Sequence, residues 1–228
     1  MKRPYFAFSL ALSLALLFGV AWLPAQAQGT EGVPAASPSA LHQDRLPPIP
    51  AGKLTDEQKK TSEEFVTIRK QPVFGPFVPL LRSPELMVRL ASMGEYLRYR
   101  TSLPPRLSEF IILITAREWT QEYEWSAHYR IALKQGLDPE IAKAVAEGRR
   151  PKKMAEDEEI VYEFSSELHR NKSVSDATYA RAVAKFGEKG MMDIVGINGY
   201  YTALAMAINV GRTPTAKDWA PMLAPLPH

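Results

Sequence analysis

The sequence of 228 residues contains no cysteine. This absence excludes disulfide bonds, metal sites built on thiolates, and every peroxidase or reductase mechanism that uses a protein thiol. It also excludes a lipoprotein, because lipid attachment after export requires a cysteine. Histidine is scarce as well, and the chain holds only His42, His128, His169 and His228. Imidazole chemistry is therefore restricted to very few positions.

Charged residues are absent from a long run near the start of the chain. Lys2 and Arg3 precede the uncharged residues 6–23, and Ala25-Gln26-Ala27 follows them. A basic start, an apolar run and a small-residue cleavage site are the three parts of a secretory signal peptide. We therefore predict a signal peptide over 1–27 and a periplasmic or secreted protein. An uncleaved anchor is the alternative, since the run approaches the ~18 apolar residues of a spanning helix.

An excess of charge of either sign is also missing. Loss of residues 1–27 removes Lys2 and Arg3 but no acidic residue, so the formal charge falls from +3 to +1. Such a balance predicts no nucleic-acid partner. Once the signal peptide is cleaved, no membrane contact is expected either. The remaining chain has the length of one domain with a tail.

The composition divides the mature chain into three parts. Residues 28–53 are rich in proline, alanine, serine and glycine, which predicts a disordered linker. Residues 54–214 carry the apolar periodicity of a folded domain, and residues 215–228 form a C-terminal tail. No internal repeat is convincing.

Helix signals begin at the start of this domain. Thr55 precedes an acidic first turn and Gln58 stands three residues later, a spacing typical of a capping box for a helix that runs to about Lys70. A proline-rich turn is expected over 72–79. Ser83 is then predicted to cap a helix that has Pro84 at its first position.

The most apolar segment of the domain is Phe110-Ile111-Ile112-Leu113-Ile114. It follows Leu103-Pro104-Pro105-Arg106, which predicts a helix start, and it is apolar on all sides, which predicts a place in the core. A buried strand is the competing interpretation, but no turn signal occurs until about Thr120. Further helices are predicted over residues 122–135, 138–148, 155–170, 175–186 and 189–210. Because no segment alternates with strand periodicity, the predicted fold class is all-α.

Glu124 and His128 are candidates for acid–base chemistry. They stand four residues apart and so share one face of the predicted helix. The carboxylate could orient the imidazole, whose ordinary pKa suits proton transfer near neutral pH. An ordinary surface pair has the same spacing, and so do two ligands of a metal site. We predict no metal, because zinc sites use three or more protein ligands and no third ligand motif is present.

Neighbouring residues suggest that this pair is partly buried. Trp125 and Tyr123 flank it, so the helix face is not simply polar. Glu109 directly precedes the apolar run and is either partly buried or an ordinary acid of a first helical turn. Arg117 lies further along the same helix. His169 stands near a helix end, where histidine usually interacts with the last carbonyl groups.

The order of these motifs resembles the carboxymuconolactone decarboxylase family, which includes the alkylhydroperoxidase AhpD-type proteins. The resemblance rests on residues 103–109, the stretch Glu122–His128 and Gly136-Leu137. It extends upstream to Phe74-Gly75-Pro76-Phe77 and downstream to Gly199-Tyr200-Tyr201. It implies an AhpD-like helical bundle, a symmetric homo-oligomer and a small-molecule substrate.

The AhpD-type pattern is a glutamate, eleven residues, a CxxC motif and a histidine four residues further. Glu109 and His128 match its ends, but the cysteine positions hold Gln121 and Glu124. A thiol peroxidase is therefore not expected. The decarboxylase branch instead has a glutamate four residues before its histidine and needs neither thiol nor cofactor. Glu124 and His128 resemble that arrangement.

The resemblance implies a cofactor-independent lyase that acts on a small organic acid or lactone. His128 would protonate the dienolate carbon left by loss of carbon dioxide, and Glu124 would set its tautomer. The implied catalytic residues are Glu124, His128 and Glu109. The implied substrate contacts are Trp125, Tyr123, Arg117 and Gln121. The alternative is a non-catalytic binding or scaffold protein that retains the fold.

Overall fold

The computed structural model of this protein describes residues 44–215 and residue 223. Every regular element in these residues is helical, which confirms the predicted all-α class. The α-helices are α1 (Asp56–Arg69), α2 (Phe77–Leu80), α3 (Pro84–Tyr99), α4 (Pro105–Glu118), α5 (Glu122–Lys134), α6 (Pro139–Ala146), α7 (Glu156–Asn171) and α8 (Asp176–Gly211). A short 3-10 helix, Ala51–Lys53, precedes them. Within the described part of the chain, no helix is long and apolar enough to cross a membrane.

Several predicted segments lie outside the described residues. These are the signal peptide, the linker up to residue 43, and almost all of the tail. The end of the predicted linker is described, and it is attached to the domain. The backbone N–H of Arg45 donates to the carbonyl of Gly211 at 2.8 Å, and Arg82 donates to the carbonyl of Pro47 at 2.7 Å. Contacts with the domain therefore begin before Leu54, the predicted start of folding.

The two predicted helix caps have different outcomes. At α1, the Thr55 hydroxyl accepts from the backbone N–H of Gln58, and the Gln58 side chain accepts from the N–H of Thr55, both at 3.1 Å. This confirms the capping box. Ser83 precedes Pro84 at α3 as predicted, but its side chain caps nothing. Its backbone N–H is instead bonded to the carbonyl of Leu80, in the turn that follows α2.

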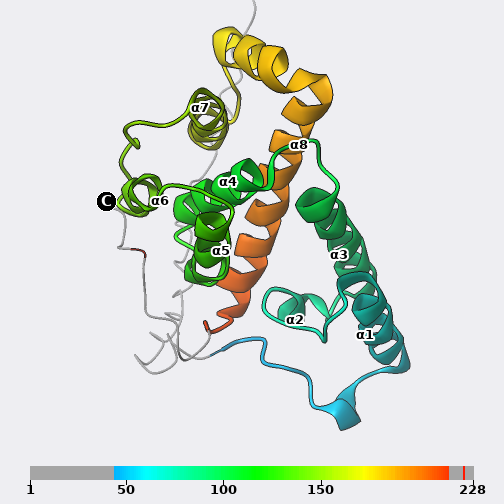
Figure 1. Cartoon of the computed structure of the whole chain (residues 1–228). Helices are drawn as coiled ribbons and strands as arrows, with labels where there is room; N and C mark the ends of the chain where they lie inside the picture. Colours follow the sequence, from blue (N-terminus) through cyan, green and yellow to red (C-terminus); the bar gives the residue numbers. More distant parts are fainter. Residues whose placement is uncertain (1–43, 216–222, 224–228) are drawn as a thin grey trace, which may run out of the picture. The chain divides into compact units, whose positions relative to one another are not determined.

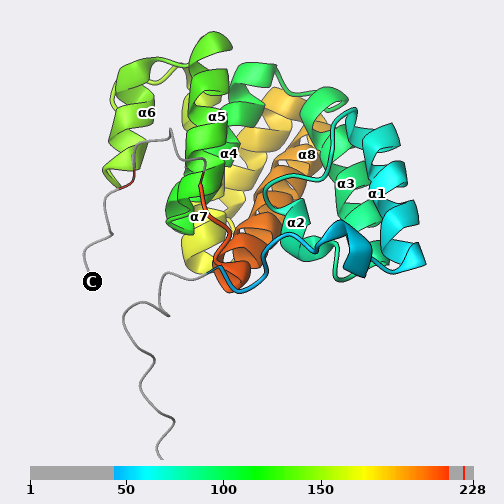
Figure 2. The same cartoon turned by 90° about the horizontal axis from the view of Figure 1, so that it is seen from below.

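Helix α4 is the centre of the bundle. The competing strand interpretation of Phe110–Ile114 is wrong, because this segment is helical and each of its side chains is at most 2% exposed. Helix α4 contacts α5, α7 and α8, and Figure 2 shows it with α8 between α1 at one edge and α6 at the other. The long helix α8 crosses behind α4 in Figure 1. A residue on α4 can therefore meet partners from several helices.

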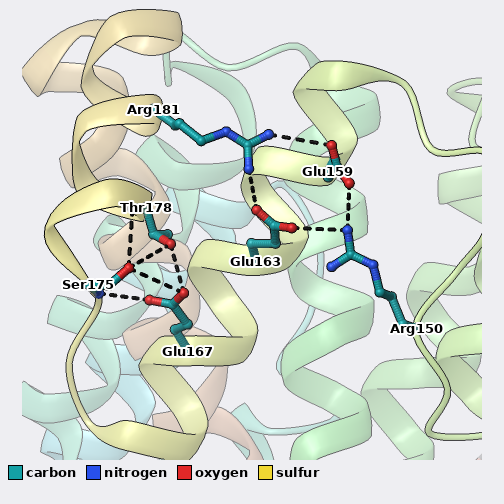
Figure 3. A network of polar contacts seen from close by, with 7 residues as sticks. All are labelled: Arg150, Glu159, Glu163, Glu167, Ser175, Thr178 and Arg181. Atoms are coloured by element: carbon teal, nitrogen blue, oxygen red, sulfur yellow. Dashed lines mark hydrogen bonds and ion pairs between the residues drawn. The ribbon is translucent and has the colours of Figure 1, made fainter.

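Helix α8 combines the two helices that were predicted at its position. Gly187 interrupts them with a φ of 68°, a left-handed conformation that glycine adopts without a steric penalty. The first part of α8 is joined to α7 by a polar network (Figure 3). Glu167 accepts from the hydroxyl of Thr178 and the backbone N–H of Ser175, both at 2.7 Å, and Arg181 pairs with Glu163. This network lies away from the residues that carry the candidate chemistry.

The proline-rich turn before α3 contains more structure than predicted. It includes α2, which begins at Phe77. The rings of Phe65, Phe74 and Phe77 form a cluster with centroid distances of 4.6 to 5.9 Å. Burial of these rings packs the turn against α1.

Candidate functional site

His128 lies on α5 with its side chain 6% exposed. The helix begins at Glu122 and is capped by Gln121, whose side-chain oxygen accepts from the N–H of Tyr123 at 2.7 Å. Glu124 stands one turn before His128 on the same face, as the spacing predicted. Its Oε2 lies 3.6 Å from Nε2 of His128. This separation is slightly too long for a direct hydrogen bond, although the two groups interact electrostatically.

The other nitrogen of His128 is bound by a residue from the central helix. Glu109 of α4 places Oε2 at 2.6 Å from Nδ1, and its side chain is 9% exposed. When Glu109 is ionised it can only accept, so Nδ1 carries a proton, and Nε2 is the ring nitrogen that lies towards Glu124. The structure thus brings the three predicted catalytic residues, Glu109, Glu124 and His128, into one buried cluster.

The charge on Glu124 is disfavoured by its surroundings. Burial raises the pKa of Glu124, while the positive charges of His128, Arg98 and Arg69 oppose that rise. Glu124 therefore holds its proton to a higher pH than an exposed glutamate does. A protonated carboxyl beside a histidine nitrogen is a donor and acceptor pair across which a proton can move.

Two tyrosines of α8 form one wall of the cluster. The ring of Tyr201 meets the His128 ring edge to face at a centroid distance of 5.1 Å, and Tyr200 meets Tyr201 at 5.0 Å. Burial raises the pKa of Tyr200 to about 12 and raises that of Tyr201 well above its ordinary value. Both phenols therefore keep their protons at neutral pH. The family resemblance covered these residues but assigned them no role.

Two arginines complete the cluster, and the sequence interpretation missed both. Arg98 of α3 interacts electrostatically with Glu109, Tyr200 and Tyr201. Arg69 at the end of α1 lies beside the Tyr200 hydroxyl, where both approach Gly94 of α3. Both arginines occur in amphipathic helices among many other charged residues, so no sequence signal distinguished them.

Three of the four predicted substrate contacts lie at the start of α5, and each also has a contact within the chain. Gln121 is a helix cap, and its amide also donates to Asn209 at 2.6 Å. Trp125 is completely buried and stacks on Tyr129, which gives it a place in the core. Tyr123 is half-buried, with its hydroxyl against Gly75. It is therefore the most accessible of the three.

The fourth predicted contact, Arg117, is directed elsewhere. It lines a cavity of about 380 Å³ together with Glu118, Tyr162 and Arg170. The reason is helical geometry, because eight residues after Glu109 the helix has turned by two full turns and about 80° more. His169 also lies apart from the cluster, where its Nε2 is 2.9 Å from the side-chain oxygen of Asn198.

Metal ligands are not grouped in the described residues. Neither 44–215 nor residue 223 contributes to any set of three or more histidine, aspartate or glutamate side chains that could hold a metal ion. The arrangement around His128 is instead one of proton donors and acceptors.

Comparisons with known proteins agree with the predicted fold. Residues 84–151 match the family model described as the Carboxymuconolactone decarboxylase family. The structure of the debrominase Bmp8 without ligand is similar with a TM-score of 0.59 and 12% identity, over 77% of this chain and 94% of that one. A cysteine-to-alanine variant of the same debrominase in complex with 2,3,4-tribromopyrrole gives a TM-score of 0.58 and 13% identity, over 75% and 91% of the two chains. No curated protein sequence matches the chain.

Proposed function

Because this domain has the fold of the carboxymuconolactone decarboxylase family, we propose that the protein is a cofactor-independent acid–base enzyme that acts on a small organic acid or lactone. The observation that carries the proposal is the position of His128, with Glu109 on one ring nitrogen and Glu124 near the other. A buried imidazole with two carboxyl partners costs desolvation energy, which proton transfer would justify.

The proposed chemistry is a lyase-type proton transfer. Loss of carbon dioxide from a substrate acid breaks a C–C bond and leaves its electron pair on an enolate. The Glu124–His128 pair would then deliver a proton to the enolate carbon and recover one from solvent. Glu109 would hold the imidazole through Nδ1 and stabilise its protonated form, so that Nε2 remains directed at the transferred proton.

A thiol mechanism is not part of the proposal, because the chain contains no cysteine. Similarity to the debrominase at 12 to 13% identity supports the fold and not the substrate. We further propose that the protein is exported, on the pattern of residues 1–27. The intact mass of the exported protein should correspond to a chain that begins at Gln28, and a mass that includes Met1 would contradict cleavage.

Comparison of two histidine variants tests the catalytic proposal. Small carboxylic acids and lactones would first be screened by thermal melting, and compounds that stabilise the protein would be assayed for turnover. His128→Ala should lower the rate by about a hundredfold or more, since a general acid–base group contributes at least that much. His169→Ala removes an imidazole outside the cluster and should leave the rate close to that of the wild type. Equal rates for His128→Ala and the wild type would refute the proposal.

The second candidate is a non-catalytic binding or scaffold protein with the same fold. It is favoured by the burial of the cluster, since the side chains of Glu124 and His128 are only 4% and 6% exposed. This candidate predicts that Glu124→Gln and His128→Ala change the free energy of unfolding but no rate. A rate defect at unchanged stability would eliminate it.

A further inference from the structure

The cluster around His128 contains more hydrogen-bond donors than acceptors. Within the described part of the chain, three buried donors have no well-aligned hydrogen bond, namely Nη1 of Arg69, Nε of Arg98 and the hydroxyl of Tyr200, and one buried acceptor, Oε1 of Glu124, also has none. Tyr200 as a whole is 2% exposed. A buried donor without an acceptor is unfavourable, and one free carboxyl oxygen cannot satisfy all three donors, which indicates that a further acceptor binds here.

The donors lie at one place in the fold. A side chain on Gly94 would collide with the Tyr200 hydroxyl and come within 2.7 Å of Nη1 of Arg69. Arg98 lies one turn after Gly94 on the same face of α3, and its charge acts on Tyr200. Arg69 lies beside the Tyr200 hydroxyl and acts on it as a poorly aligned hydrogen-bond donor. This contact leaves the proton of the phenol without an acceptor, because arginine only donates.

The balance of charge also favours an anion at this place. Arg69 and Arg98 are permanently charged, and both act on Glu124. Burial raises the pKa of Glu124 and so disfavours its charge, and Arg98 acts on Glu109 as well. Oε2 of Glu109 already binds Nδ1 of His128, so this carboxylate has another partner.

We propose that Arg69, Arg98 and Tyr200 form a subsite for a carboxylate group of the substrate, next to the proton-transfer residues. A carboxylate fits because it presents two acceptor oxygens to the planar edge of a guanidinium and can also accept from a phenol. The inference rests on the proposed function, since it names which part of the substrate acid is bound and by what. It also orients the substrate, with its carboxylate at α1 and α3 and its reacting carbon at His128.

The exposure of the residues indicates from which side a substrate would arrive. Glu109, Glu124, His128, Tyr200 and Tyr201 are all buried, whereas Arg69 and Arg98 are half-buried. Of these residues, only the arginines are partly accessible to solvent. A carboxylate would meet them first and would then carry the rest of the molecule towards His128.

Binding to the full-length protein tests the subsite without any need for turnover. The probes are acetate, benzoate and succinate, each compared with its methyl ester, and binding is followed by calorimetry and by the melting midpoint. At least one acid should bind the wild type while its ester does not. Arg98→Gln should weaken that binding about tenfold or more, in line with loss of a charge-assisted hydrogen bond. Arg89→Gln is the matched control, because Arg89 lies on the same helix and its side chain is 75% exposed.

Several outcomes would overturn the subsite. The subsite would be refuted if no acid binds the wild type, or if an acid and its ester bind equally. It would also be refuted if sulfate and chloride shift the melting midpoint equally, or if Arg98→Gln binds the acid as tightly as the wild type does. Arg98→Lys keeps the charge without the planar edge and should bind with intermediate strength, which gives a second variant if Arg98→Gln does not fold. Turnover separates the two proposals. Carboxylate binding that depends on Arg98, with a rate that does not depend on His128, would retain the subsite and reject the acid–base mechanism.

Discussion

Glu124 is 3% exposed, and burial raises the pKa of its carboxyl above the ordinary value of 4.5. The folded protein therefore binds this proton more tightly than the unfolded chain does. The resulting stability is fully present below pH 4.5 and is lost as the pH rises through the raised pKa. We expect the free energy of unfolding in urea to fall across that window, and to fall less in Glu124→Gln.

A suitable control for this pH dependence is Glu85→Gln, because Glu85 forms an exposed pair with Arg89 on α3. Exposed pairs contribute little, so this variant should retain the pH dependence of the wild type. The same pH dependence in Glu124→Gln and in the wild type would contradict the assignment to Glu124.

Gly94 permits the close approach of the Tyr200 hydroxyl and Arg69 to α3. Alanine favours a helix by about 1 kcal/mol over glycine, but its methyl group would collide with the hydroxyl. We therefore expect Gly94→Ala to lower the free energy of unfolding by about 1–3 kcal/mol, as overpacking usually does. Gly199→Ala on α8 is the control, since nothing lies within 4 Å of its added methyl group, and it should be neutral or stabilising. Equal effects of the two substitutions would argue against this close approach.

Residues differ in how well the sequence predicted their roles. Glu124 and His128 could be found because both lie on one helix, where spacing determines which side chains are neighbours. Glu109 was found through the order of motifs. Arg69 and Arg98 were not, because their approach to Glu124 depends on how α1 and α3 dock against the rest of the bundle.

At the scale of helices, Thr55 and Ser83 occupy equivalent positions, directly before the first residue of α1 and of α3. The Thr55 hydroxyl accepts a hydrogen bond from the backbone of α1, whereas the Ser83 hydroxyl accepts none from α3. Thr55→Ala should therefore lower the free energy of unfolding by about 1 kcal/mol. Ser83→Ala should change the free energy of unfolding by only a few tenths of the loss expected for Thr55→Ala. Chemical denaturation of both variants measures the difference, and similar losses would show that capping is not the cause.

Most helices could be predicted from local signals. Proline at the first position, glycine after the last turn and a 3.6-residue apolar period predicted α3 to α7 to within a few residues of their observed limits. Helix α2 was missed because four residues among prolines carry no periodicity. Its position depends on Phe77, which packs on Phe65 of α1, a contact that no local signal contains.

At the scale of the whole molecule, self-association remains a prediction from the family resemblance. Large apolar side chains are exposed on two helices, including Leu86 and Met93 of α3 and Met192 and Met206 of α8. Exposed apolar groups of this kind are suitable for an interface between copies of the chain. Light scattering of the purified protein should therefore give a molar mass that is a multiple of the mature chain's mass. A monomer at micromolar concentration would contradict the expectation.

The helical class, the absence of thiol chemistry and the proximity of Glu124 to His128 could all be predicted before the fold was known. These depend on composition and on spacing within one helix, which are local properties of the chain. The bond of Glu109 to Nδ1 of His128, the direction of Arg117 into another cavity, and the electrostatic action of Arg69 and Arg98 on Glu124 became evident only from the folded domain. These contacts join different helices, and the rotation and docking of helices follow from packing across the whole core.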